Sequence, residues 1–233
     1  MYNLIMNISL IPISGSGNRL LKIIKMKKQF FLLDKKNEMF IITLNNFVNN
    51  PLFDKSVLII DKDDEIKVQK ILSKHNLSSK VELTYGGKSR EESVYNGLKY
   101  IDSKYHKENP KVFIHDGDRP FISSELIYEL NEKALKGTIT IPGIKVKESI
   151  YDIKEGKYIN RENLVRVQTP QVAYLNDFIF AFNSATNLNL FTDEGGIFKN
   201  ASLKVKIING DEKNIKISTS QDLESGIKYI NEK

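Results

Sequence analysis

The chain alternates between continuous apolar runs and longer stretches in which apolar residues recur every three or four positions. A continuous run is typical of a buried strand, and a 3.6-residue period is typical of an amphipathic helix. The runs predict strands at 4–13, 30–33, 56–60, 81–85, 111–115 and 203–208. The period predicts helices at 39–49, from Asp61, after the Gly86-Gly87 turn, from Ser123 or Ser124, at 176–185, at 193–200 and from Ser220. In the helix after Asp61, the period turns Ile66, Ile71 and Leu72 toward the core.

Strands that alternate with helices at this spacing favour a Rossmann-like α/β fold with a doubly wound, mostly parallel sheet. Between Gly137 and Gln168 the pattern changes to short extended segments, which predicts a β-arm that protrudes from the sheet. These segments lie at 139–141, 149–153, 157–159 and 164–167. The sequence contains no internal repeat and no long linker, so we expect a single domain over 1–233, with the arm at about 137–168.

Composition narrows the classes of partner. The chain has no cysteine, which excludes disulfides and thiolate metal sites and is consistent with a reducing cytosol. No apolar run reaches the length of a membrane span, and the N-terminal stretch lacks the pattern of a signal peptide. The net charge of +6 comes from basic residues mixed with acidic ones, without a basic stripe carrying interleaved aromatics. We therefore expect a cytoplasmic protein with no nucleic-acid and no membrane partner.

A glycine-rich loop follows the first predicted strand. The run that ends at Ile13 breaks into Ser14-Gly15-Ser16-Gly17-Asn18-Arg19. Such a loop leaves several backbone N–H groups converging on one point, and Arg19 and Lys28 add positive charge beside it. The loop therefore predicts a polyphosphate site, although a plain tight turn between strand and helix has the same pattern.

Two familiar phosphate motifs do not fit the sequence. A dinucleotide fingerprint needs a third glycine where the chain has Leu20. The tetrapeptide that begins at Gly86 imitates the end of a Walker loop, but that motif would need glycine at Glu82. The opening loop is therefore a phosphate site of another kind.

Two more clusters of glycine and charged residues follow predicted strands, at 86–93 and 115–120. Ligands of open α/β sheets bind beyond the carboxyl ends of the strands, so three clusters at this edge predict a nucleotide site. Arginine is scarce in this lysine-rich chain, and Arg19, Arg90 and Arg119 all lie in or beside these turns. They suit the bidentate binding of phosphates, although some are expected to pair with carboxylates. His115, at a buried strand end, is expected to be a hydrogen-bonded core histidine rather than a general base.

Eight short motifs occur in an order that resembles the 2-C-methyl-D-erythritol 4-phosphate cytidylyltransferase family, over about residues 8–230. The motifs are Ser14-Gly15-x-Gly17-x-Arg19, Lys28-Gln29-Phe30, Gly86-Gly87-x-x-Arg90-x-x-Ser93-Val94-x-x-Gly97-Leu98, His115-Asp116-x-x-Arg119-Pro120-Phe121, Asn160-Arg161-x-Asn163-Leu164, Gln168-Thr169-Pro170-Gln171, Thr192-Asp193-Glu194 and Asn214-Ile215-Lys216-Ile217-Ser218-Thr219-x-x-Asp222-Leu223.

The resemblance implies transfer of CMP from CTP to a sugar-alcohol phosphate, with release of pyrophosphate, in isoprenoid precursor synthesis. By position in the motifs it implies catalytic roles for Arg19, Lys28 and Lys216. It implies CTP-binding roles for Ser14, Gly15, Gly17, Gly86, Gly87, Ser93 and Gly117. It implies acceptor-binding roles for Ser149, Arg161, Thr169, Thr192 and Lys216. It further implies that Asp116 faces a catalytic Mg²⁺, and that the arm is exchanged in a homodimer so that Arg161 serves the partner's site.

The sequence departs from the family pattern at several positions. Ile13-Ser14 stands where two small residues are usual, Lys27 stands where proline is usual, and the spacing from Arg19 to Lys28 is long. Tyr151 replaces a lysine of the acceptor region, as in ribitol-5-phosphate cytidylyltransferases, which supply cell-surface polymers. The other motifs favour methylerythritol phosphate as the acceptor. Ribitol phosphate, or a non-catalytic nucleotide-binding homologue, remains an alternative, and Leu20 disfavours a nicotinamide-dependent oxidoreductase.

Overall fold

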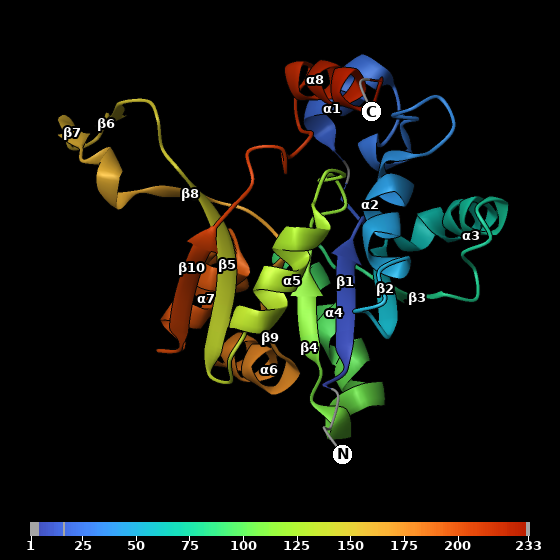
Figure 1. Cartoon of the computed structure of the whole chain (residues 1–233), viewed down its shortest axis with the longest axis horizontal. Helices are drawn as coiled ribbons and strands as arrows, with labels where there is room; N and C mark the ends of the chain where they lie inside the picture. The colour runs from blue at the N-terminus through green and yellow to red at the C-terminus, as the bar shows by residue number, and fades with distance from the viewer. Residues whose placement is uncertain (1–4, 16, 232–233) are drawn as a thin grey trace.

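The protein is built around one mixed sheet, here described from a computed structural model (Figure 1). The structure describes residues 5–15 and 17–231, without the side chains of Asn18, Arg19 and Lys22. The main sheet contains β1 (Asn7–Pro12), β2 (Lys55–Ile60), β3 (Val81–Tyr85), β4 (Lys111–Ile114), β5 (Thr138–Lys145), β8 (Val165–Val167), β9 (Gln171–Tyr174) and β10 (Lys204–Asn209). Its order is β10-β5-β9-β4-β1-β2-β3, and β8 pairs with β5 beside this path.

Most of the neighbouring strands run parallel, as the sequence predicts. β1 lies between β4 and β2 in parallel register, β3 continues this part of the sheet, and β10 runs parallel to β5. β9 is antiparallel to both β4 and β5, and β8 is antiparallel to β5. Parallel strands of this kind are buried on both faces, which is why residues 8–11 of β1 and 56–60 of β2 are buried and carry no charged side chain.

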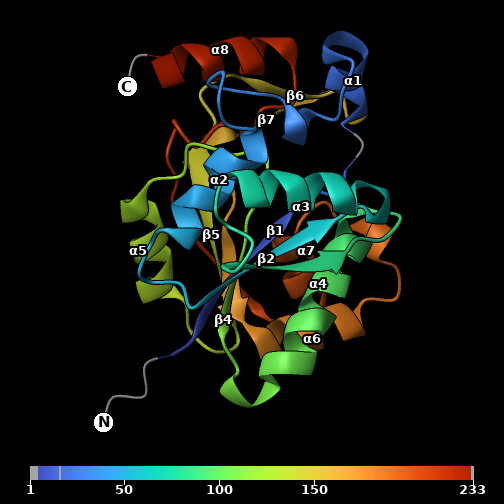
Figure 2. The ribbon, with the colours of Figure 1, turned by 90° about the vertical axis from the view of Figure 1, so that its right-hand side faces the viewer.

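Helices cover both faces of the sheet (Figures 1 and 2). The longer ones are α1 (Asn18–Ile24), α2 (Met39–Val48), α3 (Glu65–Lys74), α4 (Arg90–Tyr105), α5 (Ser124–Lys133), α6 (Leu175–Ser184), α7 (Glu194–Asn200) and α8 (Ser220–Asn231). Single 3₁₀ turns are η1 (Lys28–Phe30), η2 (Lys62–Asp64), η3 (His106–Glu108), η4 (Arg161–Asn163) and η5 (Leu188–Leu190). α4, α6 and α7 pack on one face of the sheet, and α2, α3 and α5 pack on the other.

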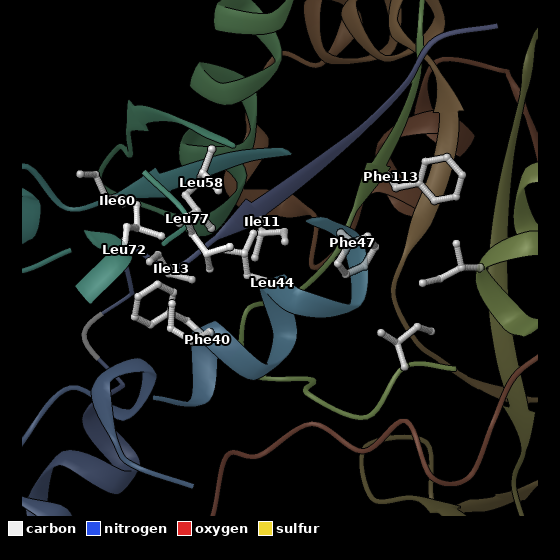
Figure 3. Close-up of a cluster of buried hydrophobic side chains, with 14 of the residues drawn as sticks. Ile11, Ile13, Phe40, Leu44, Phe47, Leu58, Ile60, Leu72, Leu77 and Phe113 are labelled. Atoms are coloured by element: carbon white, nitrogen blue, oxygen red, sulfur yellow. The ribbon is translucent and has the colours of Figure 1, made fainter. Parts of the chain in front are cut away.

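The side-chain alternation of the strands explains these two layers. Ile8 and Leu10 of β1 face the layer of α4, whereas Ile11 faces the layer of α2. Figure 3 shows this second layer, where Phe40 and Leu44 of α2 point toward the sheet. A third apolar cluster joins α1 to α8 at the top of Figure 1. The core thereby fixes the strand ends, where the predicted ligand site lies.

Three expectations about local structure are wrong. Ile66 is 70% exposed, because α3 turns Val68 and Leu72 to the core instead. Residues 30–33 do not form a strand: Phe30 ends η1 and packs edge-on against Phe40, with ring centroids 6.0 Å apart, and only Leu32 makes a strand-like bridge, to Glu38. The strand β9 follows Pro170 and has no counterpart in the prediction.

The arm is shorter than the segment in which it was expected. β5, the first strand of that segment, lies inside the main sheet with Ile139 and Ile141 buried. Beyond Lys145 the chain leaves the sheet and forms a separate hairpin of β6 (Ile150–Asp152) and β7 (Lys157–Ile159), which projects from the body at the left of Figure 1. β8 then leads the chain back to the sheet.

In the part of the chain that the structure describes, no helix has both the length and the apolar composition to cross a membrane.

Candidate active site

A cavity of about 550 Å³ lies beyond the carboxyl ends of β1, β3 and β4. Its walls come from the glycine loop after β1, the turn between β3 and α4, the 116–118 turn after β4, and residues near Lys216. The three clusters that the sequence places at strand ends therefore meet, and the segment that precedes α8 completes the fourth wall. This volume is in the range of cavities that hold small-molecule ligands.

A buried glutamine binds the backbone of the glycine loop. The Gln29 side chain is 4% exposed, and its Nε2 donates to the carbonyl oxygens of Ile13 (2.8 Å) and Gly15 (3.0 Å). Gly17, with φ of 63°, turns the chain into α1 through a left-handed conformation that favours glycine. Gln29 and Gly17 together define the path of the loop along the cavity.

A hydroxyl pair joins this loop to the turn between β3 and α4. Ser14 Oγ lies 3.2 Å from Ser93 Oγ, and Ser93 Oγ accepts a hydrogen bond from Gly87 N (2.9 Å) and donates to the carbonyl oxygen of Ser89 (2.8 Å). A Cβ at Gly86 would lie 2.6 Å from Ser14 Oγ and 2.8 Å from Ser93 Oγ. Glycine is therefore favoured at position 86 by crowding and not by backbone strain, since its φ is not in the left-handed region.

The centre of the charged wall is Asp116, at the end of β4. Asp116 is 7% exposed. Its carboxylate accepts hydrogen bonds from Arg90 Nη2 (3.0 Å), Lys216 Nζ (3.0 Å) and Arg119 Nε (3.4 Å). Burial alone would raise the pKa of the Asp116 carboxyl, but the charges of Arg90, Lys216 and Arg119 outweigh burial and hold that pKa well below its ordinary value. Asp116 is therefore ionised and holds three cationic groups at one wall.

Arg90 also binds a second buried carboxylate. Its Nη1 lies 2.7 Å from Glu194 Oε1, and Glu194 is 1% exposed at the start of α7. Burial raises the pKa of Glu194 above its ordinary value, although the Arg90 charge opposes the shift. Arg90 thus fastens the helix that begins at residue 194 to the strand end at Asp116.

His115 lies beneath this wall and is fully buried. Its Nε2 is 2.9 Å from the carbonyl oxygen of Arg119, so this nitrogen carries the proton, and its Nδ1 accepts from Thr169 Oγ1 at 3.0 Å. Burial lowers the pKa of His115 to about 4, which keeps the ring neutral. Both ring nitrogens are engaged, so the prediction of a hydrogen-bonded core histidine is confirmed.

Thr169 shares this buried position. Its hydroxyl accepts from Asp116 N (3.0 Å) and donates to His115, and the residue is 4% exposed. The Thr169 hydroxyl therefore positions the backbone of Asp116, and its role in acceptor binding stays a prediction. Its neighbour Gln168 ties the same loop to the backbone of Asp211 and Asn214.

Lysine ammonium groups line the cavity on two sides. Lys216 Nζ reaches Asp116, and its side chain is 36% exposed. Lys28 Nζ forms an ion pair with Asp118 and donates to the carbonyl oxygen of Ile217 (3.2 Å). The adjacent Lys27 points to other carboxylates, Asp61 (2.9 Å) and Asp64 (2.7 Å).

The structure brings most of the predicted residues together and leaves others apart. Those that line the cavity are Ser14, Gly15, Gly17, Lys28, Gly87, Ser93, Asp116, Gly117 and Lys216. Gly86 lies directly behind Ser14. The Arg19 side chain lies outside the described part of the structure, so its catalytic role stays a prediction.

Three predicted acceptor-binding residues are exposed and do not line this cavity. Ser149 and Arg161 belong to the arm, where Arg161 Nη1 donates to the carbonyl oxygen of Lys147. Thr192 is exposed on the loop before α7. Within one chain, Lys216 is the predicted acceptor-binding residue that reaches the cavity.

The sequence predicted that Arg90 binds phosphate or pairs with a carboxylate, and the pairing is confirmed by its contacts with Asp116 and Glu194. It assigned no role to Glu194 or Asp118. The scarcity of arginine pointed to Arg90, and Glu194 stands in the Thr192-Asp193-Glu194 motif, but neither signal showed that the two side chains meet. Asp118 falls at an unspecified position of its motif, and only its contact with Lys28 distinguishes it.

The fit to a divalent cation rests on one carboxylate. In residues 5–15 and 17–231, no three His, Cys, Asp or Glu side chains converge as a metal site would require. Mg²⁺ is often bound by one or two carboxylates, with phosphate oxygens and water as its remaining ligands. Asp116 is one such carboxylate, but its contacts with Arg90, Arg119 and Lys216 oppose a further cation, so it would fit Mg²⁺ only together with the phosphates of a nucleotide.

Comparison with known proteins agrees with the geometry. The model of the family "IspD: 2-C-methyl-D-erythritol 4-phosphate cytidylyltransferase" matches residues 7–232. The 2-C-methyl-D-erythritol 4-phosphate cytidylyltransferase of Clostridioides difficile is 33% identical over 227 residues, covering 95% of this chain and 92% of that protein. That of Geobacillus kaustophilus is 32% identical and covers 85% and 86% of the two chains.

Solved structures are similar over the same extent. The crystal structure of the Francisella tularensis 2-C-methyl-D-erythritol 4-phosphate cytidylyltransferase has a TM-score of 0.76 and 29% identity, covering 97% of this chain and 98% of that one. The 4-diphosphocytidyl-2C-methyl-D-erythritol synthase of Anaerococcus prevotii has a TM-score of 0.80 and 25% identity, covering 98% and 100%. Sequence motifs, site geometry and these similarities agree, and the chain belongs to the 2-C-methyl-D-erythritol 4-phosphate cytidylyltransferase family.

Proposed function

We propose that the protein transfers CMP from CTP to 2-C-methyl-D-erythritol 4-phosphate and releases pyrophosphate. The observation that carries this proposal is the convergence of the glycine loop, Lys28, Asp116 and Lys216 on one cavity at the strand ends. The glycine loop and the 86–93 turn would hold the nucleotide, and Lys216 would face the acceptor phosphate. Family membership supports both the activity and the choice of substrates.

The reaction requires the protein to position the two substrates and to supply positive charge. An oxygen of the acceptor phosphate attacks the α-phosphorus of CTP, the bond to the β-phosphate breaks in line, and pyrophosphate leaves with the bonding electrons. The acceptor phosphate is already ionised near neutral pH, so no general base is needed, and His115 is not available as one. Catalysis then comes from holding both phosphates in line and from positive charge on the oxygens where negative charge accumulates.

The named cations suit these two tasks. Lys28, beside the glycine loop, would stabilise the charge that develops on the departing pyrophosphate. Lys216, held by Asp116, would orient the acceptor phosphate for attack. Asp116 would hold Mg²⁺ together with the triphosphate, and the ion would supply further neutralisation of the phosphate charge.

We also propose that the enzyme is a cytoplasmic homodimer in which the arm completes the neighbouring site. Apolar side chains on the arm are exposed in the single chain: Ile153 by 91%, Tyr158 by 75% and Tyr151 by 52%. Exposed apolar side chains on a projecting hairpin are typical of an interface with a second copy of the chain. A second copy would also supply the acceptor-binding residues that one chain does not bring to its own cavity. Arg161 would then reach the acceptor phosphate in the partner's cavity.

Pyrophosphate release tests the proposal. The protein is given CTP and Mg²⁺ with 2-C-methyl-D-erythritol 4-phosphate, ribitol 5-phosphate or glycerol 3-phosphate in parallel reactions. We expect release with the methylerythritol substrate at a kcat/KM well above that of the other two. Preference for ribitol 5-phosphate would favour an enzyme of cell-surface polymer synthesis. CTP binding without release from any acceptor would indicate a non-catalytic homologue.

A further inference from the structure

The ion pair between Lys28 and Asp118 joins two segments that meet across the cavity wall. Lys28 belongs to η1, and Asp118 follows β4 by four residues. Both side chains are largely covered, with 17% of Lys28 and 10% of Asp118 exposed. The backbone on the Asp118 side is itself fixed, because Asp118 O accepts from Ile217 N at 2.9 Å. The carboxylate therefore has a defined position from which to hold the lysine.

Among the described residues, Lys28 is the cation that contacts the Asp118 carboxylate and balances its charge. Asp118 Oδ1 is buried and has no hydrogen-bond partner among the described residues, and Oδ2 contacts Lys28. A buried carboxylate that loses its cation is costly, because little water replaces the lost interaction. Lys28 is therefore expected to stay with Asp118 when a nucleotide enters, rather than to move from carboxylate to phosphate.

A lysine that stays in place still has a donor for the nucleotide. An ammonium group has three N–H donors. The Asp118 carboxylate takes one and the carbonyl oxygen of Ile217 takes another (3.2 Å). Lys28 lines the cavity, so its remaining donor is the one left for a ligand. Two anchored donors fix the direction of the third.

We propose that Asp118 is a positioning residue for Lys28: with the carbonyl oxygen of Ile217, it aims the free N–H of the Lys28 ammonium at a phosphate oxygen of the nucleotide. This proposal deepens the proposed function and rests on it. It also gives a reason why Lys28 reaches the cavity although its spacing from Arg19 is long. The lysine is directed by a contact with the β4 side of the site and not by the length of its own loop.

A double-mutant cycle separates positioning from simple electrostatics. Inorganic tripolyphosphate binding is measured by calorimetry for the wild type, Lys28→Ala, Asp118→Ala and the double variant. With Asp118 present, we expect Lys28→Ala to weaken binding by about tenfold or more. In the Asp118→Ala background the same change should weaken binding by less than about threefold, because an undirected lysine contributes little. The cycle cancels the general effect of removing a negative charge from the cavity.

The opposite coupling would overturn the proposal. If Lys28→Ala costs more once Asp118 is removed, the carboxylate competes with the phosphate for the lysine. If the cost is the same in both backgrounds, the two residues act independently. Because tripolyphosphate binding needs no acceptor and no turnover, this result is distinct from a failure of the proposed function, which would appear as absent pyrophosphate release by the wild type.

Two further variants keep the test free of folding artefacts. Asp118→Asn retains an oxygen that accepts from the ammonium, so it should restore most of the Lys28 contribution that Asp118→Ala loses. Asp64→Ala is the matched control, since Asp64 binds the neighbouring Lys27 (2.7 Å) and does not contact Lys28. It should leave the Lys28 contribution and the turnover unchanged. Thermal unfolding midpoints within a few degrees of the wild type show that all variants are folded.

Discussion

The cavity wall and the arm carry similar charged residues but hold them in different ways. At the wall, Asp116 is 7% exposed and contacts Arg90, Arg119 and Lys216. On the arm, Arg161 donates to a backbone carbonyl oxygen, and the Lys157–Glu155 pair is 4.0 Å apart with both side chains more than half exposed. Exposed pairs of this kind contribute little, whereas a buried network fixes its members in one geometry.

The difference shows which residues one chain can place for catalysis. The wall is built from strand ends that the sheet already fixes, so its charges are in position before a ligand arrives. The arm joins the body through β5 and β8 and through an exposed ion pair between Lys147 and Glu212 (2.8 Å), and the apolar side chains of its hairpin remain exposed. Residues on the arm therefore need another surface to define their position, and this is the reason for proposing a partner chain.

Lys216→Ala should give the largest effect, because it removes a charge directed at the reacting phosphate from the rigid region. We expect kcat to fall by about two to three orders of magnitude, as for other groups that stabilise a transition state directly. CTP binding, measured by calorimetry without acceptor, should change little. An equal loss of CTP affinity would move Lys216 to the nucleotide side of the cavity.

His115 should make the stability of the rigid region depend on pH. The pKa of His115 falls from an ordinary 6.5 to about 4 in the folded protein, so between these values the unfolded chain binds more protons. Above about pH 6.5, neutral His115 therefore makes its full contribution to the free energy of unfolding. This contribution decreases as the pH falls toward 4, by about 3 kcal/mol in total.

Denaturant unfolding of the wild type and His115→Gln between pH 4 and 7 measures this contribution. The variant should be less stable at pH 7 and should lack the part of the slope that His115 provides. The raised pKa of Glu194 acts in the opposite direction but is common to both proteins, so it cancels in the difference. Parallel curves for the two proteins would contradict the assignment.

Arg161→Ala tests whether the arm acts on a second chain. Alone, it should raise KM for the acceptor by about tenfold or more while CTP binding is kept, since one charged contact to phosphate is lost. When Arg161→Ala and Lys216→Ala chains are refolded together, half of the dimers contain one of each. In those dimers one site has both intact residues, so kcat/KM for the acceptor should recover to about a quarter of the wild-type value. A mixture no more active than its separate components would place Arg161 outside the partner's site.

Glycine substitutions should give the smallest effects and should differ in kind between the two regions. At Gly86 an added methyl group would press on Ser14 and Ser93, so Gly86→Ala should raise KM for CTP by up to about tenfold. At Gly156, in the arm, an added Cβ would meet only the Tyr151 hydroxyl, at an ordinary contact distance of 3.9 Å, but φ is 65°. Gly156→Ala should therefore cost about 1 kcal/mol locally through backbone strain and leave KM for CTP unchanged. Steady-state kinetics with both substrates distinguishes the two.

Much of the fold follows from local pattern. The boundaries of β2, β3, α4 and α7 agree with the prediction within a few residues, because each combines an apolar period with a capping or turn residue. β9 was missed because it has four residues and begins with the polar Gln171, too short for a period to develop. Ile66 was misplaced because the period fits two adjacent faces of α3, and only packing chooses between them.

The candidate site was predicted where residues are close in sequence. The glycine loop and the 86–93 turn each lie within one motif, and the rule that ligands bind at the carboxyl ends of parallel strands brings them together. The contact of Arg90 with Glu194 joins residues 104 positions apart, and that of Lys28 with Asp118 joins residues 90 positions apart. Such pairings depend on tertiary structure, which no local pattern contains.

The reversed direction of β9 has a consequence for how the chain tolerates insertions. Because β9 runs against its neighbours, the residues that precede it, and not those that follow it, reach the ligand edge: Thr169 bonds to Asp116 N and Gln168 to the 211–214 loop. An extra residue between Gln168 and Gln171 would displace these contacts. The chain reversal at η3, before β4, lies at the opposite edge of the sheet, where backbone positions are exposed and remote from the cavity. Peptide tags or circularly permuted termini belong at η3, and residues 168–170, which lead into β9, should be left intact.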